Sequence, residues 1–169
     1  MDRIASEGAD TGSTASAPAY AAAVSRLLAV HGDTRDALLP LLHALQAEFG
    51  FIDDAMIPPL AAALNLSRAD VHGVVTFYHD FRRAPAGRHL VKLCRAESCQ
   101  ARGSAATERD MLAALGVGLG ETTADGGVTV DAVYCLGLCA IGPNALVDGI
   151  PVARLDADRV ARIVREVTA

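Results

Sequence analysis

Apolar residues in the first half of the chain recur with the spacing of an α-helix in four successive segments. Within each segment they fall on one face when the segment is helical. The residues that form these faces are Tyr20, Val24, Leu27 and Leu28; Leu38, Leu42, Leu45 and Phe49; Ile57, Leu60, Ala61 and Leu64; and Val71, Val74, Val75 and Tyr78. Because short loops join the segments, neighbouring helices should run antiparallel. The pattern predicts a small helical bundle over residues 18–80.

Residues at the ends of these segments favour the same structure. Gly50 comes directly after the second segment, where a glycine of positive φ often ends a helix. Pro58 and Pro59 fall in the first turn of the third segment, where a missing N–H costs least. Ser67 and Asp70 open the fourth segment with the spacing of a capping box, in which Asp replaces the usual Glu or Gln.

The second half of the chain changes to a mixture of strand and helix signals. Pro85 and Gly87 interrupt the helical pattern and mark a linker. Asp148 and Gly149 form a dipeptide that is typical of hairpin turns. The pattern predicts strands over 89–93, 128–134, 145–147 and 152–154, and helices over 104–115 and from Asp156 onward. The fold class that follows is α+β, with a helical bundle before an α/β sandwich.

These changes of pattern predict three parts of the chain. Residues 1–17 are polar and of low complexity, so we expect a disordered tail. Residues 18–83 form the helical bundle and residues 84–169 form the mixed domain.

Composition and charge narrow the possible functions. Apolar residues make up 51% of the 169 residues, which is enough for a core, although Trp is absent and aromatic residues are only 4%. The net charge of −5 disfavours nucleic-acid binding, which normally uses a basic patch. No apolar run approaches the roughly 18 residues of a membrane span. The first residues lack the apolar segment of a secretory signal, so we expect a cytoplasmic location.

The four cysteines are the residues most informative about chemistry. Cys94 and Cys99 form a C-x4-C pair, and Cys135 and Cys139 form a C-x3-C pair after 35 intervening residues. Each pair begins at the end of a predicted strand. Two adjacent strands that end at one edge of a sheet would therefore bring the pairs together, and four thiolates there need a multivalent cation to offset their repulsion.

Four interpretations of the cysteines remain open on spacing alone. A structural zinc site usually has C-x2-C loops, which these pairs lack. A dithiol redox centre uses C-x-x-C at a helix N-terminus, which is also missing. Buried or disulfide-bonded cysteines are disfavoured in a reducing compartment. A [2Fe–2S] cluster takes two thiolates per iron, so it suits one pair per loop and is the interpretation that we favour.

Nearby residues would modulate such a cluster. Gly137 and Gly142 let the second loop curl and direct N–H groups toward sulfur. Lys92, Arg95 and Arg102 are candidate cations that would stabilise the extra negative charge of the reduced state. The five histidines have no convincing metal-ligand spacing, and the chain has neither G-x-G-x-x-G nor a P-loop. We expect no catalytic residue and no nucleotide site in this chain.

Three stretches resemble one known family. They are VHGVVTFYH at residues 71–79, CRAESCQ at residues 94–100 and CLGLCAIGPN at residues 135–144. They are similar to the thioredoxin-like [2Fe–2S] subunits of NADH-dehydrogenase modules, over about residues 20–168. This family includes the small iron–sulfur subunit of respiratory complex I and matching subunits of NAD-linked hydrogenases. The 94–100 loop most resembles the gamma subunit of bacterial NAD-dependent, molybdenum-containing formate dehydrogenase.

The resemblance implies a thioredoxin-like [2Fe–2S] domain after the helical bundle. It implies that Cys94, Cys99, Cys135 and Cys139 ligate one [2Fe–2S] cluster. It also implies a direct partner subunit that binds FMN and NAD and that docks against the bundle, with the cluster near the FMN. A separate molybdenum-containing subunit would oxidise formate. The alternatives are the equivalent subunit of complex I or of a hydrogenase, and a zinc-stabilised interaction module with no redox role.

Overall fold

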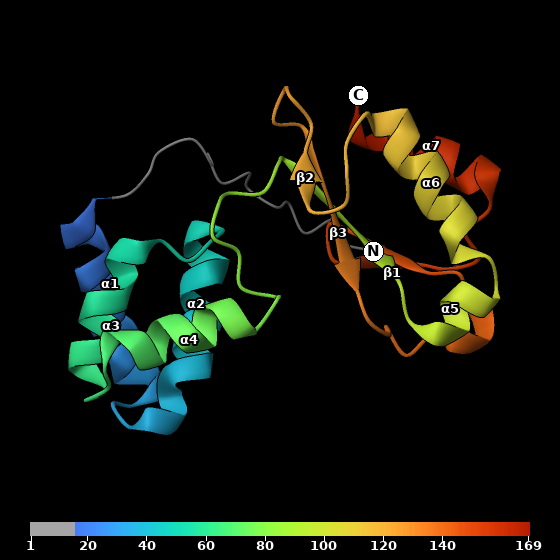
Figure 1. The fold of residues 1–169 in the computed structure, drawn as a ribbon. Helices are drawn as coiled ribbons and strands as arrows, with labels where there is room; N and C mark the ends of the chain where they lie inside the picture. Colours follow the sequence, from blue (N-terminus) through green and yellow to red (C-terminus); the bar gives the residue numbers. More distant parts are fainter. Residues whose placement is uncertain (1–15) are drawn as a thin grey trace, which may run out of the picture. The chain divides into compact units, whose positions relative to one another are not determined.

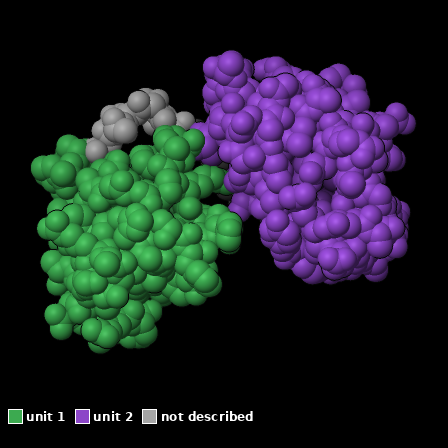
Figure 2. Space-filling view, viewed as in Figure 1, with its two compact units in different colours: residues 1–85 green, residues 86–169 purple. Residues whose placement is uncertain are grey.

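A computed structural model describes residues 16–169 of the protein. Most of the tail predicted over residues 1–17 lies outside the described residues. The chain divides into two compact units, with the boundary along the chain between Pro85 and Ala86 (Figure 2). Among the described residues, no helix is both long enough and apolar enough to cross a membrane.

The first unit is helical, as the sequence predicts. Its α-helices are joined by short loops and two 3-10 turns (Figure 1). In chain order the elements are α1 (Ala17–His31), η1 (Arg35–Ala37), α2 (Leu38–Phe49), η2 (Asp54–Met56), α3 (Ile57–Ala63) and α4 (Arg68–Phe77). One apolar core holds these helices together, and its fully buried members include Leu41, Leu42, Leu45, Leu60 and Val71.

The helix ends of this unit follow the predicted chemistry. Gly50 has φ 81° after α2, and its N–H donates to the carbonyl of Gln46. Ser67 and Asp70 form a reciprocal capping box at the start of α4. One expectation is wrong: the apolar spacing puts Tyr78 on the buried face of the fourth helix, but α4 ends at Phe77 and Tyr78 is 43% exposed. The chain turns to extended backbone at Tyr78 and so carries its ring off the helix face.

The second unit contains a five-stranded sheet with the order β2-β3-β1-β4-β5. Its elements are β1 (His89–Cys94), α5 (Glu97–Ala101), α6 (Ser104–Leu115), β2 (Glu121–Thr122), β3 (Val128–Val133), η3 (Cys139–Ile141), β4 (Ala145–Val147), β5 (Ile150–Val152) and α7 (Ala157–Val167). Strands β1 and β3 are parallel, and the other pairings are antiparallel. The α+β class is therefore confirmed.

The sequence pattern does not predict two elements of this unit, and it places the start of a third at the wrong residue. The short helix α5 and the two-residue strand β2 have too few residues to show a period. The last strand begins at Ile150 rather than Val152, because Asp148 and Gly149 both take positive φ and turn the chain at once.

Helices α6 and α7 pack together beside the sheet (Figure 1). Met111 of α6 and Val160, Ile163 and Val167 of α7 share one apolar core with sheet residues such as Val91. The helices thus cover the sheet and fix the strands whose ends carry the cysteines.

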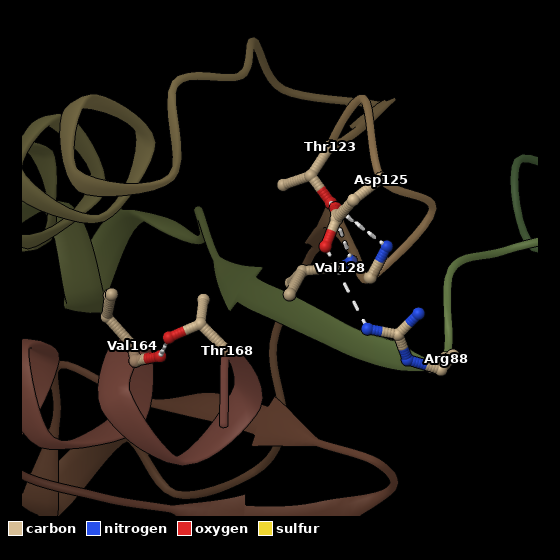
Figure 3. A network of polar contacts seen from close by, with 7 residues as sticks. Arg88, Thr123, Asp125, Val128, Val164 and Thr168 are labelled. Carbon is tan, nitrogen blue, oxygen red and sulfur yellow. Dashed lines mark hydrogen bonds and ion pairs between the residues drawn. The ribbon is translucent and has the colours of Figure 1, made fainter.

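A polar turn leads into β3 (Figure 3). The hydroxyl of Thr123 and the N–H of Gly127 both donate to Asp125, and Arg88 lies 3.8 Å from the same carboxylate. The Thr123 hydroxyl and the Gly127 N–H hold the pKa of Asp125 below its usual value. Thr123 also accepts from the Val128 N–H, so the turn sets where β3 begins.

Candidate metal centre

The two cysteine pairs start from the same edge of the sheet. Cys94 is the last residue of β1, and Cys135 follows the end of β3 by two residues. The strands are parallel neighbours, with Cys94 opposite Val133. The N–H of Arg95 donates to the carbonyl of Val133 over 2.9 Å, which continues the pairing past Cys94. The predicted convergence of these strand ends is confirmed.

The other cysteine of each pair lies on a short helical turn. Cys99 lies in α5, whose five residues begin just after Cys94. Cys139 is the first residue of η3. Each cysteine pair is therefore bridged by a turn that brings the second thiol back toward the first. Figure 1 shows α5 beside the chain that follows β3.

The second pair has a separation that fits one metal ion. The Sγ atoms of Cys135 and Cys139 are 3.7 Å apart. Two metal–thiolate bonds of about 2.3 Å that meet at the tetrahedral angle would separate the sulfurs by about 3.8 Å. Cys135 and Gly137 both take positive φ, at 74° and 75°, which curls the loop around this point. Positive φ is unusual for a cysteine, so this loop is held in a costly shape.

Burial differs sharply between the pairs. Cys94 and Cys99 are buried, whereas Cys135 is exposed and Cys139 is half-buried. All four are free thiols. The first pair therefore lies within the protein, and the second pair forms the solvent-facing side of the site.

Backbone N–H groups surround the thiol of Cys94. Burial opposes its ionisation, but the N–H groups of Ala96, Cys135 and Leu136, together with the thiol of Cys99, lower its pKa overall. Two of these donors belong to the loop of the second pair. The second loop thus directs N–H groups toward a sulfur of the first pair, as a cradle for anionic sulfur does.

The pKa shifts of the other thiols have causes in both cysteine pairs. Burial is the largest cause of the raised pKa of Cys99, and Cys94 and Cys139 add to it. The thiol of Cys135 is the largest cause of the raised pKa of Cys139, and the charge of Cys94 contributes. Four thiolates at this place therefore repel one another, and a multivalent cation would relieve that repulsion. The donor set fits a [2Fe–2S] cluster, with one pair for each iron.

The candidate cations differ in what they contact. Arg95 forms an ion pair with Glu108 over 3.0 Å, whereas Nε of Arg102 donates to the carbonyl of Gly142 over 3.0 Å. Arg102 thus links the chain after α5 to the loop of the second cysteine pair. A role for Lys92, Arg95 or Arg102 in tuning the potential stays a prediction.

Sequence reasoning does not single out two polar residues at this site. Asn144 is buried and contacts the thiol of Cys99, and the side chain of Ser98 partly offsets the rise in the pKa of Cys139. Asn144 ends the 135–144 stretch, but only the fold shows that its side chain contacts Cys99.

Over residues 16–169, no group of three or more His, Cys, Asp and Glu side chains is placed to hold one metal ion.

Comparison with known proteins finds one matching family and several similar oxidoreductase subunits. Residues 24–168 match the family model of the thioredoxin-like [2Fe–2S] ferredoxins. The chain is 35% identical over 132 residues to the E subunit of the NADH-quinone oxidoreductase of Pseudomonas aeruginosa, and the match covers 78% of this chain and 80% of that protein. The corresponding protein of Escherichia coli is 32% identical over 132 residues, with the same two coverages.

Solved structures agree with the sequence matches. An NAD+-reducing [NiFe]-hydrogenase in the H2-reduced state has a chain that superposes with a TM-score of 0.69 at 28% identity, covering 80% of this chain. The air-oxidised state of an NAD+-reducing [NiFe]-hydrogenase gives a TM-score of 0.66 and covers 78% of this chain. This protein spans less than a quarter of those hydrogenase chains, at 22% and 23%. Because the family model matches residues 24–168 of this chain, the chain belongs to the thioredoxin-like [2Fe–2S] ferredoxin family.

Proposed function

We propose that Cys94, Cys99, Cys135 and Cys139 hold one [2Fe–2S] cluster and that the chain is a one-electron carrier of an NADH-dehydrogenase-type module. The observation that carries the proposal is the meeting of two free-thiol pairs at the ends of two parallel strands. The 3.7 Å separation of the second pair supports two thiolates on one iron. The family match supports the identity of the cofactor.

The protein's own residues have three tasks in this role. When bound, the cluster accepts and releases electrons one at a time. Cys94 and Cys99 anchor its inner side within the protein, where burial limits access of water. Cys135 and Cys139 hold its outer side at the surface. The N–H groups of Ala96, Cys135 and Leu136 stabilise negative charge on the sulfur of Cys94.

The direct partner in this proposal is a protein that binds FMN and NAD. Hydride transfer to NAD moves two electrons, whereas a [2Fe–2S] centre moves one, so a flavin must stand between them. The similar NADH-quinone oxidoreductase and NAD+-reducing hydrogenase chains support a partner of this kind. The cytoplasmic location expected from the sequence remains a prediction.

The finer assignment is to NAD-dependent formate dehydrogenase, which oxidises formate to CO2 and reduces NAD+. The resemblance of residues 94–100 to its gamma subunit supports this assignment, and a molybdenum-containing subunit would then belong to the same complex. The equivalent role in complex I is the second candidate, favoured by the identity to the two NADH-quinone oxidoreductase proteins. Purification of the tagged chain from its own cells, followed by molybdenum analysis and a formate-dependent NAD+ reduction assay, distinguishes the two. Quinone-linked NADH oxidation without molybdenum would contradict the formate assignment.

The metal centre is tested on the anaerobically purified full chain. We expect about two iron and two acid-labile sulfide per chain, and an S = 1/2 EPR signal after reduction with dithionite. Cys99→Ser should lose most of the iron or change the signal, whereas Ser104→Ala, a buried hydroxyl on α6, should leave both unchanged. A colourless protein that contains only zinc would contradict the redox role.

A further inference from the structure

The second cysteine pair holds two sulfurs close together at the surface. The Sγ atoms of Cys135 and Cys139 are 3.7 Å apart, whereas a disulfide bond is about 2.0 Å long. The two sulfurs must therefore approach by about 1.7 Å to bond. Each sulfur moves when its side chain turns about the Cα–Cβ bond, and Gly137 gives the chain between them freedom to follow.

Contacts outside the pair keep the two cysteines at this separation. Strand β3 ends two residues before Cys135 and is held by its parallel partner β1. On the other side of the pair, the carbonyl of Ile141 accepts from the N–H of Arg154 over 2.9 Å, and the carbonyl of Gly142 accepts from Arg102. The close approach of the sulfurs is thus supported by the surrounding fold and not by the loop alone.

Burial separates the two pairs in their access to solutes. Cys135 is exposed and Cys139 is half-buried, whereas Cys94 and Cys99 are only 2% and 0% exposed. An oxidant in solution must reach a thiolate to react with it, so oxidation of the cluster-free chain starts at Cys135. Cys139 then lies within reach as a second thiol, which is the arrangement found in thiol pairs that sense oxidants.

We propose that Cys135 and Cys139 are a modification site of the cluster-free chain, where hydrogen peroxide joins them in a disulfide that blocks cluster loading until a thiol reduces it. The effect on loading rests on the proposed function, because it takes both residues as cluster ligands. The oxidation itself rests only on the geometry and the exposure of the pair.

The oxidation has two steps. First, the thiolate of Cys135 attacks one oxygen of peroxide, the O–O bond breaks, and a sulfenic acid and a hydroxide form. Second, the thiolate of Cys139 attacks that sulfur, an S–S bond forms, and the S–O bond breaks to release a second hydroxide. The protons lost from the two thiols convert both hydroxides to water. The thiols together lose two electrons and two protons, and the peroxide becomes two molecules of water.

The disulfide removes the ligands from one half of the site. Thiolates bind the metal, and a sulfur in a disulfide is no longer a thiolate. One iron would then lack both of its ligands, while Cys94 and Cys99 stay reduced because they are buried. Exposed disulfides are reduced more readily than buried structural ones, so a thiol such as glutathione reverses the block. The disulfide also prevents further oxidation of Cys135 to a sulfinic acid, which is irreversible.

Peroxide treatment of the cluster-free full chain tests the oxidation. The chain is prepared anaerobically with its four thiols reduced, treated briefly with hydrogen peroxide and then alkylated in denaturant. We expect the number of free thiols to fall from four to two, and peptide mass spectrometry to locate the disulfide between Cys135 and Cys139. Four remaining thiols would overturn the proposal, and so would a main product with a Cys94–Cys99 disulfide or a disulfide between two chains.

Two variants test the order of the two steps. In Cys139→Ser the sulfenic acid of Cys135 has no second thiol to react with, so dimedone, which traps sulfenic acids, should label Cys135. Ser104→Ala, which removes a buried hydroxyl on α6, is the control and should form the disulfide at the rate of the unmodified protein. Peroxide treatment of Cys139→Ser without dimedone labelling at Cys135 would overturn the first step.

Loading is measured separately on the oxidised and the reduced chain. Each is mixed anaerobically with a scaffold protein that carries a [2Fe–2S] cluster, without free thiol or sulfide, and is then re-isolated for iron analysis. We expect iron in the reduced chain, almost none in the disulfide form, and full recovery after glutathione treatment. Full loading of the disulfide form would overturn the block. Failure of the reduced chain to take up a cluster would instead overturn the proposed function, and a disulfide between Cys135 and Cys139 would still stand.

Discussion

Arg102 donates from Nε to the carbonyl oxygen of Gly142 over 3.0 Å, and so ties the chain after the first cysteine pair to the chain after the second. Arg102 follows α5 directly, and Gly142 follows η3. The two loops are therefore joined by a side chain as well as by the strands from which they start.

Arg102→Met should loosen this connection while retaining an apolar stem of similar length. We expect a loss of about 1 kcal/mol in the free energy of unfolding of the cluster-free chain, because one hydrogen bond is removed. The loaded chain should release iron to a chelator faster than the unmodified protein. Arg109→Met removes an exposed arginine of α6 and serves as the control. Equal release rates in both variants would contradict the role assigned to Arg102.

Gly142→Ala should disturb the site by crowding. A Cβ at this position would lie 3.2 Å from Sγ of Cys99 and 3.5 Å from Nδ2 of Asn144, although the backbone at φ −69° suits alanine. We expect about 1–3 kcal/mol of destabilisation and a lower iron content per chain. Thermal unfolding and iron analysis measure the two effects.

The control for that variant is Gly73→Ala in the interior of α4. A Cβ there would meet nothing within 4 Å, and glycine is a poor helix former. We expect a gain of roughly 0.5–1 kcal/mol in stability with unchanged iron content. Loss of iron from Gly73→Ala, or full iron in Gly142→Ala at unchanged stability, would show that crowding of Cys99 is not the cause.

Alkylation of the cluster-free chain should follow the burial of the cysteines. We expect Cys135 to react first and Cys139 next, with Cys94 and Cys99 slower by roughly tenfold or more because reagents reach them only when the structure opens. Mass spectrometry of peptides after brief iodoacetamide treatment measures the order. In denaturant the four rates should become similar. Fast reaction of Cys99 in the folded chain would be inconsistent with its burial.

Acid should weaken the start of α4. The hydroxyl of Ser67 is the largest cause of the lowered pKa of Asp70, and the N–H of Ser67 adds to it. Because the folded state has the lower pKa, this stabilisation is present above the unfolded value of about 4 and is lost as pH falls through the folded value.

Hydrogen exchange of the α4 amides in Asp70→Asn measures that contribution. The variant should exchange faster than the unmodified protein at neutral pH, and the difference should shrink below about pH 4. Asp33→Asn, an exposed carboxylate in the loop after α1, should show no such difference. Ser67→Ala should weaken the same helix by about 1 kcal/mol.

Local sequence signals predict most of the fold because they act over a few residues. The ends of α2 and α4 follow from Gly50 and from the Ser67 and Asp70 pair, and the final hairpin follows from Asp148 and Gly149. The convergence of Cys94 and Cys135 is also predictable, since each follows a strand. Helix α5 escapes prediction, because five residues are too few to show a helical period.

Contacts between distant residues are not predictable in the same way. Asn144 is 45 residues from Cys99 along the chain, and nothing in its neighbourhood indicates that its amide returns to that sulfur. The exposure of Tyr78 likewise depends on where α4 stops rather than on the spacing of apolar positions. Side-chain partners at the metal centre thus depend on tertiary packing.

The parallel pairing of β1 with β3 also determines when a nascent chain can be loaded with metal. Cys94 and Cys99 leave the ribosome well before the residues of β3, and β1 lies between β3 and β4 in the finished sheet. If the four cysteines hold one cluster, iron delivery waits until Cys139 has been translated, and a transcript that stops before β3 would yield Cys94 and Cys99 without the strand that brings the second pair to them.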